Sequence, residues 1–263
     1  MNIQTEAKRF LHAEKNKQSI EPLTHTFPDL TVDEAYSIQL KQIEEKVSNG
    51  AKVVGKKIGL TSQVMQEMFQ VNEPDYGHLL DDMLHIDGDD ISLDAFLEPK
   101  LEFEIAFLLK EDLQGPGVTV IDVLEATEYV APAFEVIDSR IKDWNIRFED
   151  TVADNGSSAR AILGGNPTPI DQVDLPHLGM AVYRNGRFID SATGAAVMGN
   201  PARAVAWLAN ALGKYDISLH QGDIVLSGAL TAAVPIQDGD TFTADFAHIG
   251  SVSASFYKED HAK

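Results

Sequence analysis

The sequence predicts an α+β fold, in which a mixed β-sheet body carries flanking helices and an α-rich N-terminal region. Three patterns support this prediction. Residues 97–110 alternate strictly between apolar and other side chains, which is typical of a β-strand. Before that strand, residues 2–17 and 31–47 repeat apolar side chains at helical spacing. Most of the last third of the chain, in contrast, alternates as strands do, and such separate helical and strand regions are typical of α+β proteins.

Two helices are expected before any strand. Residues 2–17 place apolar side chains in one broad stripe, which should face the core. The second helix begins with a capping box, in which Thr31 is the N-cap and Glu34 the third helical residue. It should end near Gly50, because glycine favours the end of a helix.

A short strand is expected over residues 51–60, followed by Thr61 and Ser62, which can cap a short helix through Phe69. Backbone N–H groups at such a helix start can bind a carboxylate. Lys57 lies just before this point. From its position alone, Lys57 is either an ordinary surface lysine or a cation near a binding site.

Residues 71–83 contain turn-forming Pro74 and Gly77 and are expected to form a loop. Asp75 lies in this loop, before a tyrosine and a glycine. It is either a turn residue or a catalytic carboxylate.

The central strand carries two carboxylates on one face. Its other face is wholly apolar and should point into a core: Leu101, Phe103, Ile105, Phe107 and Leu109. Glu102 and Glu104 are two residues apart, so their Cα atoms lie about 7 Å from each other on the same face. Hard divalent cations prefer such oxygen ligands, so the pair indicates either a metal site or the solvated face of an edge strand.

A second apolar strand, residues 128–137, carries one acidic residue, Glu135. A buried carboxylate without a partner is costly, so Glu135 needs a metal, a cation or a proton. Arg140 and Lys142 are the nearest candidate partners along the chain.

Residues 144–160 look irregular and polar, and they hold Asp154 and Asn155. Such a loop can act as a lid or simply connect two elements. A brief strand is expected over residues 161–165.

Sequence patterns in the last third of the chain predict a hairpin, a helix and further strands. Asn185 and Gly186 form the strongest two-residue hairpin signal. Pro201, preceded by Asn200, marks the first turn of a helix. Further strands are expected over these ranges: 222–230, 241–246 and 252–257.

Composition excludes several classes of protein. The formal net charge of −20 argues against binding nucleic acid or an anionic membrane surface. The chain has no cysteine, so disulfides and thiolate metal sites are excluded. No transmembrane run or secretion signal is evident, so a cytoplasmic protein is expected. We expect a helical lobe over residues 1–70 packed on a β-rich catalytic body over residues 71–263, or one continuous domain.

Seven stretches in order resemble the fumarylacetoacetate hydrolase superfamily, within its branch of 2-hydroxypenta-2,4-dienoate hydratases and 4-oxalocrotonate decarboxylases. They are VVGKKIGLTS (53–62), EPDYGHLLDDM (73–83), PKLEFEIAFLL (99–109), PAFEVIDSRIKDW (132–144), DTVADNGSSARAILGG (150–165), GNPARAVAWLANAL (199–212) and GDIVLSGALTAAVPIQDGDTF (222–242). Together they span nearly the whole chain. The resemblance implies a β-sheet roll or sandwich of that family's type.

The resemblance also implies a divalent ion, Mg²⁺ or Mn²⁺, held by three carboxylates that match Glu102, Glu104 and Glu135. The family's lysine matches Lys57. Hydratases of this branch tend to carry an aspartate where this chain has Asp75, whereas the decarboxylases tend to carry an apolar residue.

On this basis we expect a hydratase that adds water to a 2-hydroxy-2,4-dienoate in the meta-cleavage catabolism of aromatic compounds. Lys57 and Asp75 would exchange protons, and Thr61 and Ser62 would hold the substrate carboxylate. The loop that holds Asp154 and Asn155 would add polar contacts to the substrate or help to close the site.

Other functions stay open at this point. One is 4-oxalocrotonate decarboxylation at the same metal site, and another is a non-catalytic partner of a sister enzyme. A fumarylpyruvate-type hydrolase is a weaker alternative, because no water-activating pair of His and Glu is evident. The resemblance implies a homo-oligomer, with a downstream aldolase or a sister decarboxylase as a further partner.

Overall fold

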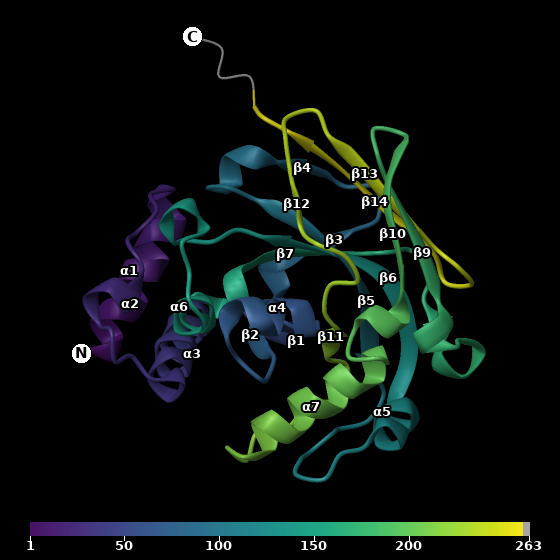
Figure 1. The fold of residues 1–263 in the computed structure, drawn as a ribbon, viewed down its shortest axis with the longest axis horizontal. Helices are drawn as coiled ribbons and strands as arrows, with labels where there is room; N and C mark the ends of the chain where they lie inside the picture. Colours follow the sequence, from purple (N-terminus) through teal and green to yellow (C-terminus); the bar gives the residue numbers. More distant parts are fainter. Residues whose placement is uncertain (260–263) are drawn as a thin grey trace.

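The computed structural model describes residues 1–259, which fold into two β-sheets with helices at their edges (Figure 1). The larger sheet has nine strands, with the main order β2-β1-β11-β5-β6-β7-β3, while β12 pairs with β5 and β8 with β6. The smaller sheet has five strands in the order β10-β9-β13-β14-β4. This confirms the expected α+β fold with a mixed β-sheet body.

The bounds of the elements are as follows. The helices are α1 (Ile3–Asn16), α2 (Leu23–Thr26), α3 (Val32–Ser48), α4 (Gln63–Phe69), α5 (Val120–Ala126), α6 (Phe148–Ala153) and α7 (Pro201–Gly213). The strands up to β7 are β1 (Val53–Gly59), β2 (Asp75–Leu80), β3 (Leu84–Ile86), β4 (Asp90–Ser92), β5 (Lys100–Leu109), β6 (Thr127–Ile137) and β7 (Ser158–Leu163). The remaining strands are β8 (Thr168–Pro169), β9 (Gly179–Arg184), β10 (Arg187–Thr193), β11 (Ile224–Leu226), β12 (Val234–Pro235), β13 (Thr241–Phe246) and β14 (Gly250–Tyr257).

The apolar face of β5 packs into the main core, between the two sheets. Phe103 of β5 contacts Phe134 of β6 edge to face, with ring centroids 5.4 Å apart, and it also contacts Phe242 of β13. Phe242 in turn contacts Phe256 of β14. Aromatic pairs in this geometry add to the energy of burial, so the two sheets are joined through side chains that the alternating pattern assigned to the core.

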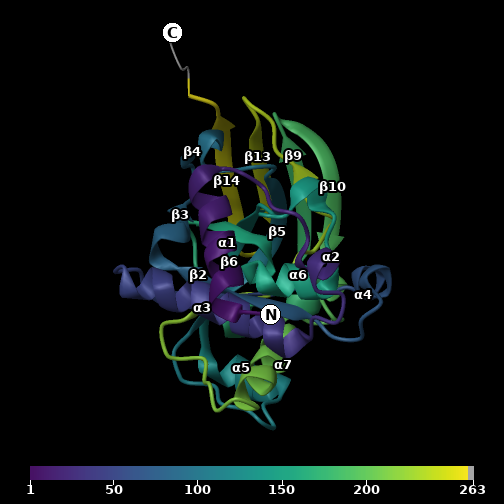
Figure 2. The ribbon, with the colours of Figure 1, turned by 90° about the vertical axis from the view of Figure 1, so that its left-hand side faces the viewer.

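The N-terminal helices gather on one side of the sheets, as Figures 1 and 2 show. The capping box at the start of α3 is present, with the Thr31 hydroxyl accepting from the Glu34 amide. Gln39 of α3 donates to the carbonyl oxygens of Tyr76 on β2 and Val152 on α6. These hydrogen bonds connect the N-terminal helices to β2 and α6.

Several expected elements differ from those observed. Residues 71–83 are not a simple loop, because they contain β2, in which all six residues are buried. The strand was not predicted because Pro74 and Gly77 are typical of turns, but it pairs with β1 along its length. Residues 144–160 are not wholly irregular either, since they contain α6. The short strands β3, β4, β8 and β12 were not expected.

The hairpin, the last helix and the last strand pair agree with the sequence. Asn185 and Gly186 have φ values of 52° and 72°, as a two-residue hairpin turn requires. Asn200 caps α7 through its side chain, with Pro201 as the first helical residue. Within residues 1–259, no helix combines the length and the apolar character needed to cross a membrane.

Candidate active site

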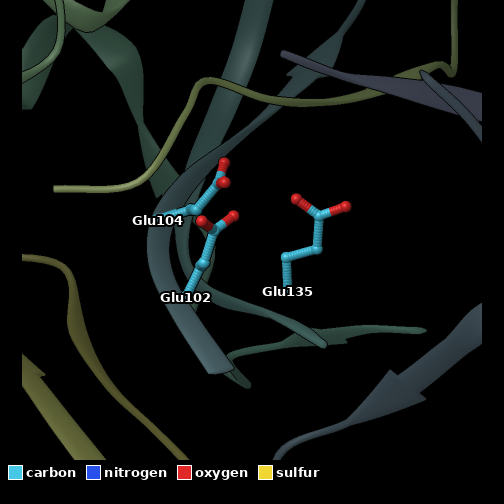
Figure 3. A group of neighbouring side chains, drawn as sticks. All are labelled: Glu102, Glu104 and Glu135. Carbon is cyan, nitrogen blue, oxygen red and sulfur yellow. The ribbon is translucent and has the colours of Figure 1, made fainter. Parts of the chain in front are cut away.

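Three glutamates converge at the centre of the larger sheet (Figure 3). Glu102 and Glu104 project from the same face of β5, and Glu135 lies directly opposite Glu102 on β6. One carboxylate oxygen from each residue lies within 4.8 Å of those of the other two. The expected grouping of these three residues is therefore present in space.

Glu104 and Glu135 lie in the interior and Glu102 is half-buried, and β5 is a central strand rather than an edge strand. Glu104 and Glu135 have no exposed surface. Glu104 Oε2 accepts a hydrogen bond of 2.7 Å from the Gly228 amide. Glu104 Oε1 is buried and has no hydrogen-bond partner within residues 1–259. Like charges this close repel each other, so a hard divalent cation, which prefers carboxylate oxygens, fits the donor set.

Burial raises the pKa values of all three carboxyl groups, and for Glu102 and Glu104 repulsion within the cluster adds to this effect. The pKa of Glu102 rises to about 7, because burial disfavours its charge and the Glu135 carboxylate adds to this effect against the opposing influence of Lys57. Burial, followed by the charges of Glu135 and Glu102, raises the pKa of Glu104 well above its usual value. The site therefore resists holding three negative charges unless positive charge is supplied.

Lys57 supplies one of the positive charges. It lies on β1 and is only 3% exposed, so the interpretation as a surface lysine is wrong. Its Nζ lies 3.4 Å from Glu135 Oε2 and donates a hydrogen bond of 3.0 Å to the Gly156 carbonyl. Burial lowers the pKa of Lys57, but the charges of Glu135 and Asp75 outweigh burial and raise it above its ordinary value. Lys57 is thus a buried ammonium at neutral pH.

Asp75 lies beside Lys57 because β2 pairs with β1, which places Asp75 opposite Gly59. A Cβ atom at Gly59 would lie 2.0 Å from Asp75 Oδ1 and 3.2 Å from Lys57 Nζ. Only glycine leaves room there for both groups. Asp75 is 1% exposed, and burial raises its pKa although Lys57 lowers it.

A left-handed turn carries the carbonyl that binds Lys57. Asn155, Gly156 and Ser157 all have φ between 56° and 58°. A Cβ atom at Gly156 would lie 3.3 Å from Lys57 Nζ, so the turn runs close against the ammonium. Left-handed backbone is unfavourable for residues other than glycine, so surrounding contacts must hold this turn in place.

Asp154 and Asn155 provide those contacts and do not line the cavity. Asp154 is fully buried, and its Oδ1 accepts a hydrogen bond of 2.6 Å from Arg140 Nε. Arg140 therefore pairs with Asp154 and not with Glu135, for which it had been a candidate partner. Asn155 Oδ1 accepts from the His78 amide at 2.7 Å, and Asn155 Nδ2 donates to the His78 carbonyl at 3.0 Å. Both side chains therefore serve to position the turn.

Lys57, Asp75 and Glu102 open onto one cavity of about 1090 Å³. Thr61 and Ser62 also line it. The Ser62 hydroxyl accepts from the Met65 amide and so caps α4, as expected.

Thr61 packs against Gly228, where a Cβ atom would lie 2.3 Å from its Oγ1. The φ of Gly228 is 111°, a conformation that favours glycine. The structure thereby brings Thr61 next to the backbone group that holds Glu104.

Sequence reasoning missed two backbone contributions, the Gly228 amide and the Gly156 carbonyl. It also missed the cavity-lining side chains Lys100, Trp144 and Arg147. The placement of Lys100 on the same strand face as Glu102 and Glu104 was a usable signal. The two backbone contacts have no signal in the sequence, because almost any residue supplies a backbone amide and a carbonyl.

Comparisons with known proteins agree with this geometry. Residues 50–256 match the model of the family described as fumarylacetoacetate (FAA) hydrolase, C-terminal. The chain is 45% identical to 2-hydroxyhexa-2,4-dienoate hydratase of Comamonas testosteroni, with 97% of each chain covered. It is 42% identical to 2-oxo-hept-4-ene-1,7-dioate hydratase of Escherichia coli, with 95% of this chain and 96% of that protein covered.

A solved structure of 4-oxalocrotonate decarboxylase from Pseudomonas putida G7, complexed with magnesium and adipate, superposes with a TM-score of 0.95. The two proteins are 38% identical, and the comparison covers 97% of each chain.

Proposed function

The chain belongs to the fumarylacetoacetate hydrolase family, and we propose that it is a hydro-lyase that adds water to a 2-hydroxy-2,4-dienoate. The product would be a 4-hydroxy-2-oxoalkanoate. The observation that carries the proposal is that a buried ammonium, Lys57, and a buried carboxylate, Asp75, lie beside three convergent glutamates and line one cavity together with Glu102. Relatives more than 40% identical over nearly their full length are named as hydratases.

Glu102, Glu104 and Glu135 would hold Mg²⁺ or Mn²⁺. Bound there, such an ion would supply a Lewis acid for the oxygen atom at C2 of the substrate. The chain holds these ligands through the sheet, since Glu102 and Glu135 are a cross-strand pair and the Gly228 amide fixes Glu104. Thr61, with Ser62 at the start of α4, is suitably placed for the substrate carboxylate.

The reaction requires four proton movements. In ketonisation a proton leaves the 2-hydroxyl group and another arrives at C5, which conjugates the C3–C4 double bond with the C2 carbonyl. When water then adds, its oxygen bonds to C4, one of its protons leaves and a proton arrives at C3. We assign proton donation to the Lys57 ammonium and proton acceptance to the Asp75 carboxylate, because its raised pKa makes Asp75 a stronger base.

We propose that Asp154 and Asn155, which the sequence had suggested as substrate contacts, act instead by holding the turn that carries Gly156. That turn gives Lys57 Nζ a fixed carbonyl acceptor. A lysine anchored at both Glu135 and Gly156 has little rotational freedom, which favours a defined direction of proton transfer.

The second candidate function is decarboxylation of 2-oxo-3-hexenedioate, which the superposition on 4-oxalocrotonate decarboxylase favours. It would use the same glutamates but no activated water. Incubating the protein with Mg²⁺ and each substrate separates the two functions. Loss of dienoate absorbance without CO₂ release supports the hydratase, and CO₂ release without hydration rejects it.

Assembly and location belong to this proposal as well. We infer a homo-oligomer acting in the cytoplasm in aromatic-compound catabolism, with a downstream aldolase or sister decarboxylase as partner. A role as a non-catalytic partner predicts no turnover of any dienoate by the isolated protein. Turnover by the purified chain would therefore reject that role.

A further inference from the structure

The cavity wall carries two cationic side chains that the proposed chemistry does not use. Lys100 and Arg147 both line the cavity, in a protein whose formal net charge is −20. Within residues 1–259, neither of these side chains forms a direct ion pair, although the Glu98 and Glu102 carboxylates act electrostatically on Lys100. The acidic residue Glu149 also lines the cavity.

Lys100 is held in place by an aromatic ring. Its Nζ lies 3.9 Å from the centre of the Trp144 ring, and Trp144 Nε1 donates a hydrogen bond of 3.1 Å to the Glu98 carbonyl. A cation over the face of a tryptophan is stabilised electrostatically. The ammonium is thereby held at the cavity wall.

The separation of Lys100 from the glutamates determines how long a ligand must be to reach both. Lys100 and Glu102 are alternate residues on one face of β5, so their Cα atoms lie about 7 Å apart. A ligand whose first carboxylate lies near the glutamates would direct its other end toward Lys100 and Trp144. The cavity wall also includes apolar side chains that suit a carbon chain, namely Leu60, Phe69, Val71, Ile137, Ile146 and Leu230.

We propose that the substrate is a dicarboxylate whose distal carboxylate binds Lys100, with Arg147 as a second cation. This inference rests on the proposed function, because it assumes that the first carboxylate lies near Glu102. Lys100, held by Trp144, would then select dienoates that end in a carboxylate over those that end in a methyl or methylene group. A distal carboxylate would give Lys100 and Arg147 a direct ion-pair partner, whereas an apolar end would not.

The first test is a binding measurement that needs no turnover. Adipate and hexanoate have the same chain length and differ only in the distal carboxylate. Titration calorimetry of the Mg²⁺-loaded protein should show adipate binding about tenfold more tightly, as expected for a hydrogen bond between charged groups. Lys100→Gln should abolish this preference while leaving hexanoate binding unchanged, and Arg147→Gln should reduce it.

Lys110→Gln is the matched control, because Lys110 follows β5 directly and its side chain is exposed. It should keep the preference for adipate. Equal binding of adipate and hexanoate by the unaltered protein would overturn the proposal. The proposal would also be overturned if Lys100→Gln and Arg147→Gln both kept the full preference for adipate over hexanoate.

The second test uses turnover and separates this inference from the proposed function. If both hold, 2-hydroxyhepta-2,4-diene-1,7-dioate should have a higher kcat/KM than 2-hydroxyhexa-2,4-dienoate, and Lys100→Gln should raise KM for the dioate with little change in kcat. A faster reaction with the monocarboxylate would reject the dicarboxylate assignment and leave the hydratase intact. No hydration of either compound, with the adipate preference retained, would reject the hydratase function and leave the distal carboxylate site intact.

Discussion

Glu102 on β5 and Glu135 on β6 are direct cross-strand partners, facing each other across the centre of the larger sheet. Like charges directly opposite each other destabilise a sheet, and burial increases the effect. The pair is therefore a cost to the metal-free fold that a bound cation would relieve.

Glu102→Gln should weaken Mg²⁺ or Mn²⁺ binding on the order of 100-fold, because it removes a charged ligand while keeping the side-chain shape. Calorimetric titration of the metal-free protein measures the change. Glu98→Gln, on the residue before Pro99 and outside the cluster, should bind metal as the unaltered protein does. Unchanged affinity in Glu102→Gln would contradict the metal site.

Lys57→Met should destabilise the metal-free protein by about 3–5 kcal/mol, because it leaves the buried Glu135 carboxylate without its cation. Added Mg²⁺ should restore much of this stability, since it replaces the lost positive charge. Denaturant unfolding with and without Mg²⁺ measures both effects. Hydration should stay at least about 100-fold slower even with metal bound, because a general acid is lost. Full activity in Lys57→Met would exclude Lys57 as the proton donor.

Asp75→Asn should slow hydration by about 10²–10⁴-fold, because an amide cannot accept the proton of the attacking water. Metal affinity should change little, since Asp75 is not among the three convergent glutamates. The assay is loss of dienoate absorbance, paired with a metal titration of the same preparation. Asp82→Asn, on an exposed residue just beyond β2, should have normal activity.

Asn155→Ala should lower the free energy of unfolding by about 2–4 kcal/mol. It removes both hydrogen bonds to the His78 backbone and places alanine at a φ of 56°. Activity should fall as well, because the turn that carries the Gly156 carbonyl would lose its support. Asn145→Ala, at an exposed position, controls for the loss of an amide. Unaltered urea unfolding of Asn155→Ala would rule out the positioning role.

The stability of the metal-free protein should fall as pH rises between about 4.5 and 7. The pKa of Glu102 is raised from 4.5 to about 7 on folding, so the native state holds a proton that the unfolded state has already released. The contribution is fully present below pH 4.5 and is lost as pH passes about 7. The stabilisation by Mg²⁺ should grow over the same interval, because protons and metal compete for the carboxylates. Thermal unfolding at several pH values, with and without Mg²⁺, measures both trends, and a metal effect that shrinks with rising pH would contradict this account.

The regular elements were largely predictable because their signals are local. Strict alternation identified the core face of β5, where Leu101, Phe103, Ile105 and Phe107 are fully buried. The capping box at Thr31 and the Asn185-Gly186 turn each depend on two or more neighbouring residues. The strand β2 was not predicted, because Pro74 and Gly77 favour a turn. Its pairing with β1 stabilises the extended conformation, and this pairing cannot be recognised from neighbouring residues in the sequence.

Local patterns in the chain identified the residues that are chemically able to form the site: three glutamates on two apolar strands, a lysine between two glycines, and an aspartate before Tyr76. How these residues meet depends on contacts between distant segments. Pairing of β2 with β1 places Asp75 opposite Gly59, and a left-handed turn brings the Gly156 carbonyl to Lys57. The fold also buries Asp154 beside Arg140, and it places Lys100 and Arg147 on the cavity wall. These features could not be predicted because charge and alternation are properties of neighbouring residues, whereas burial and electrostatic partners arise between segments that are distant in the chain.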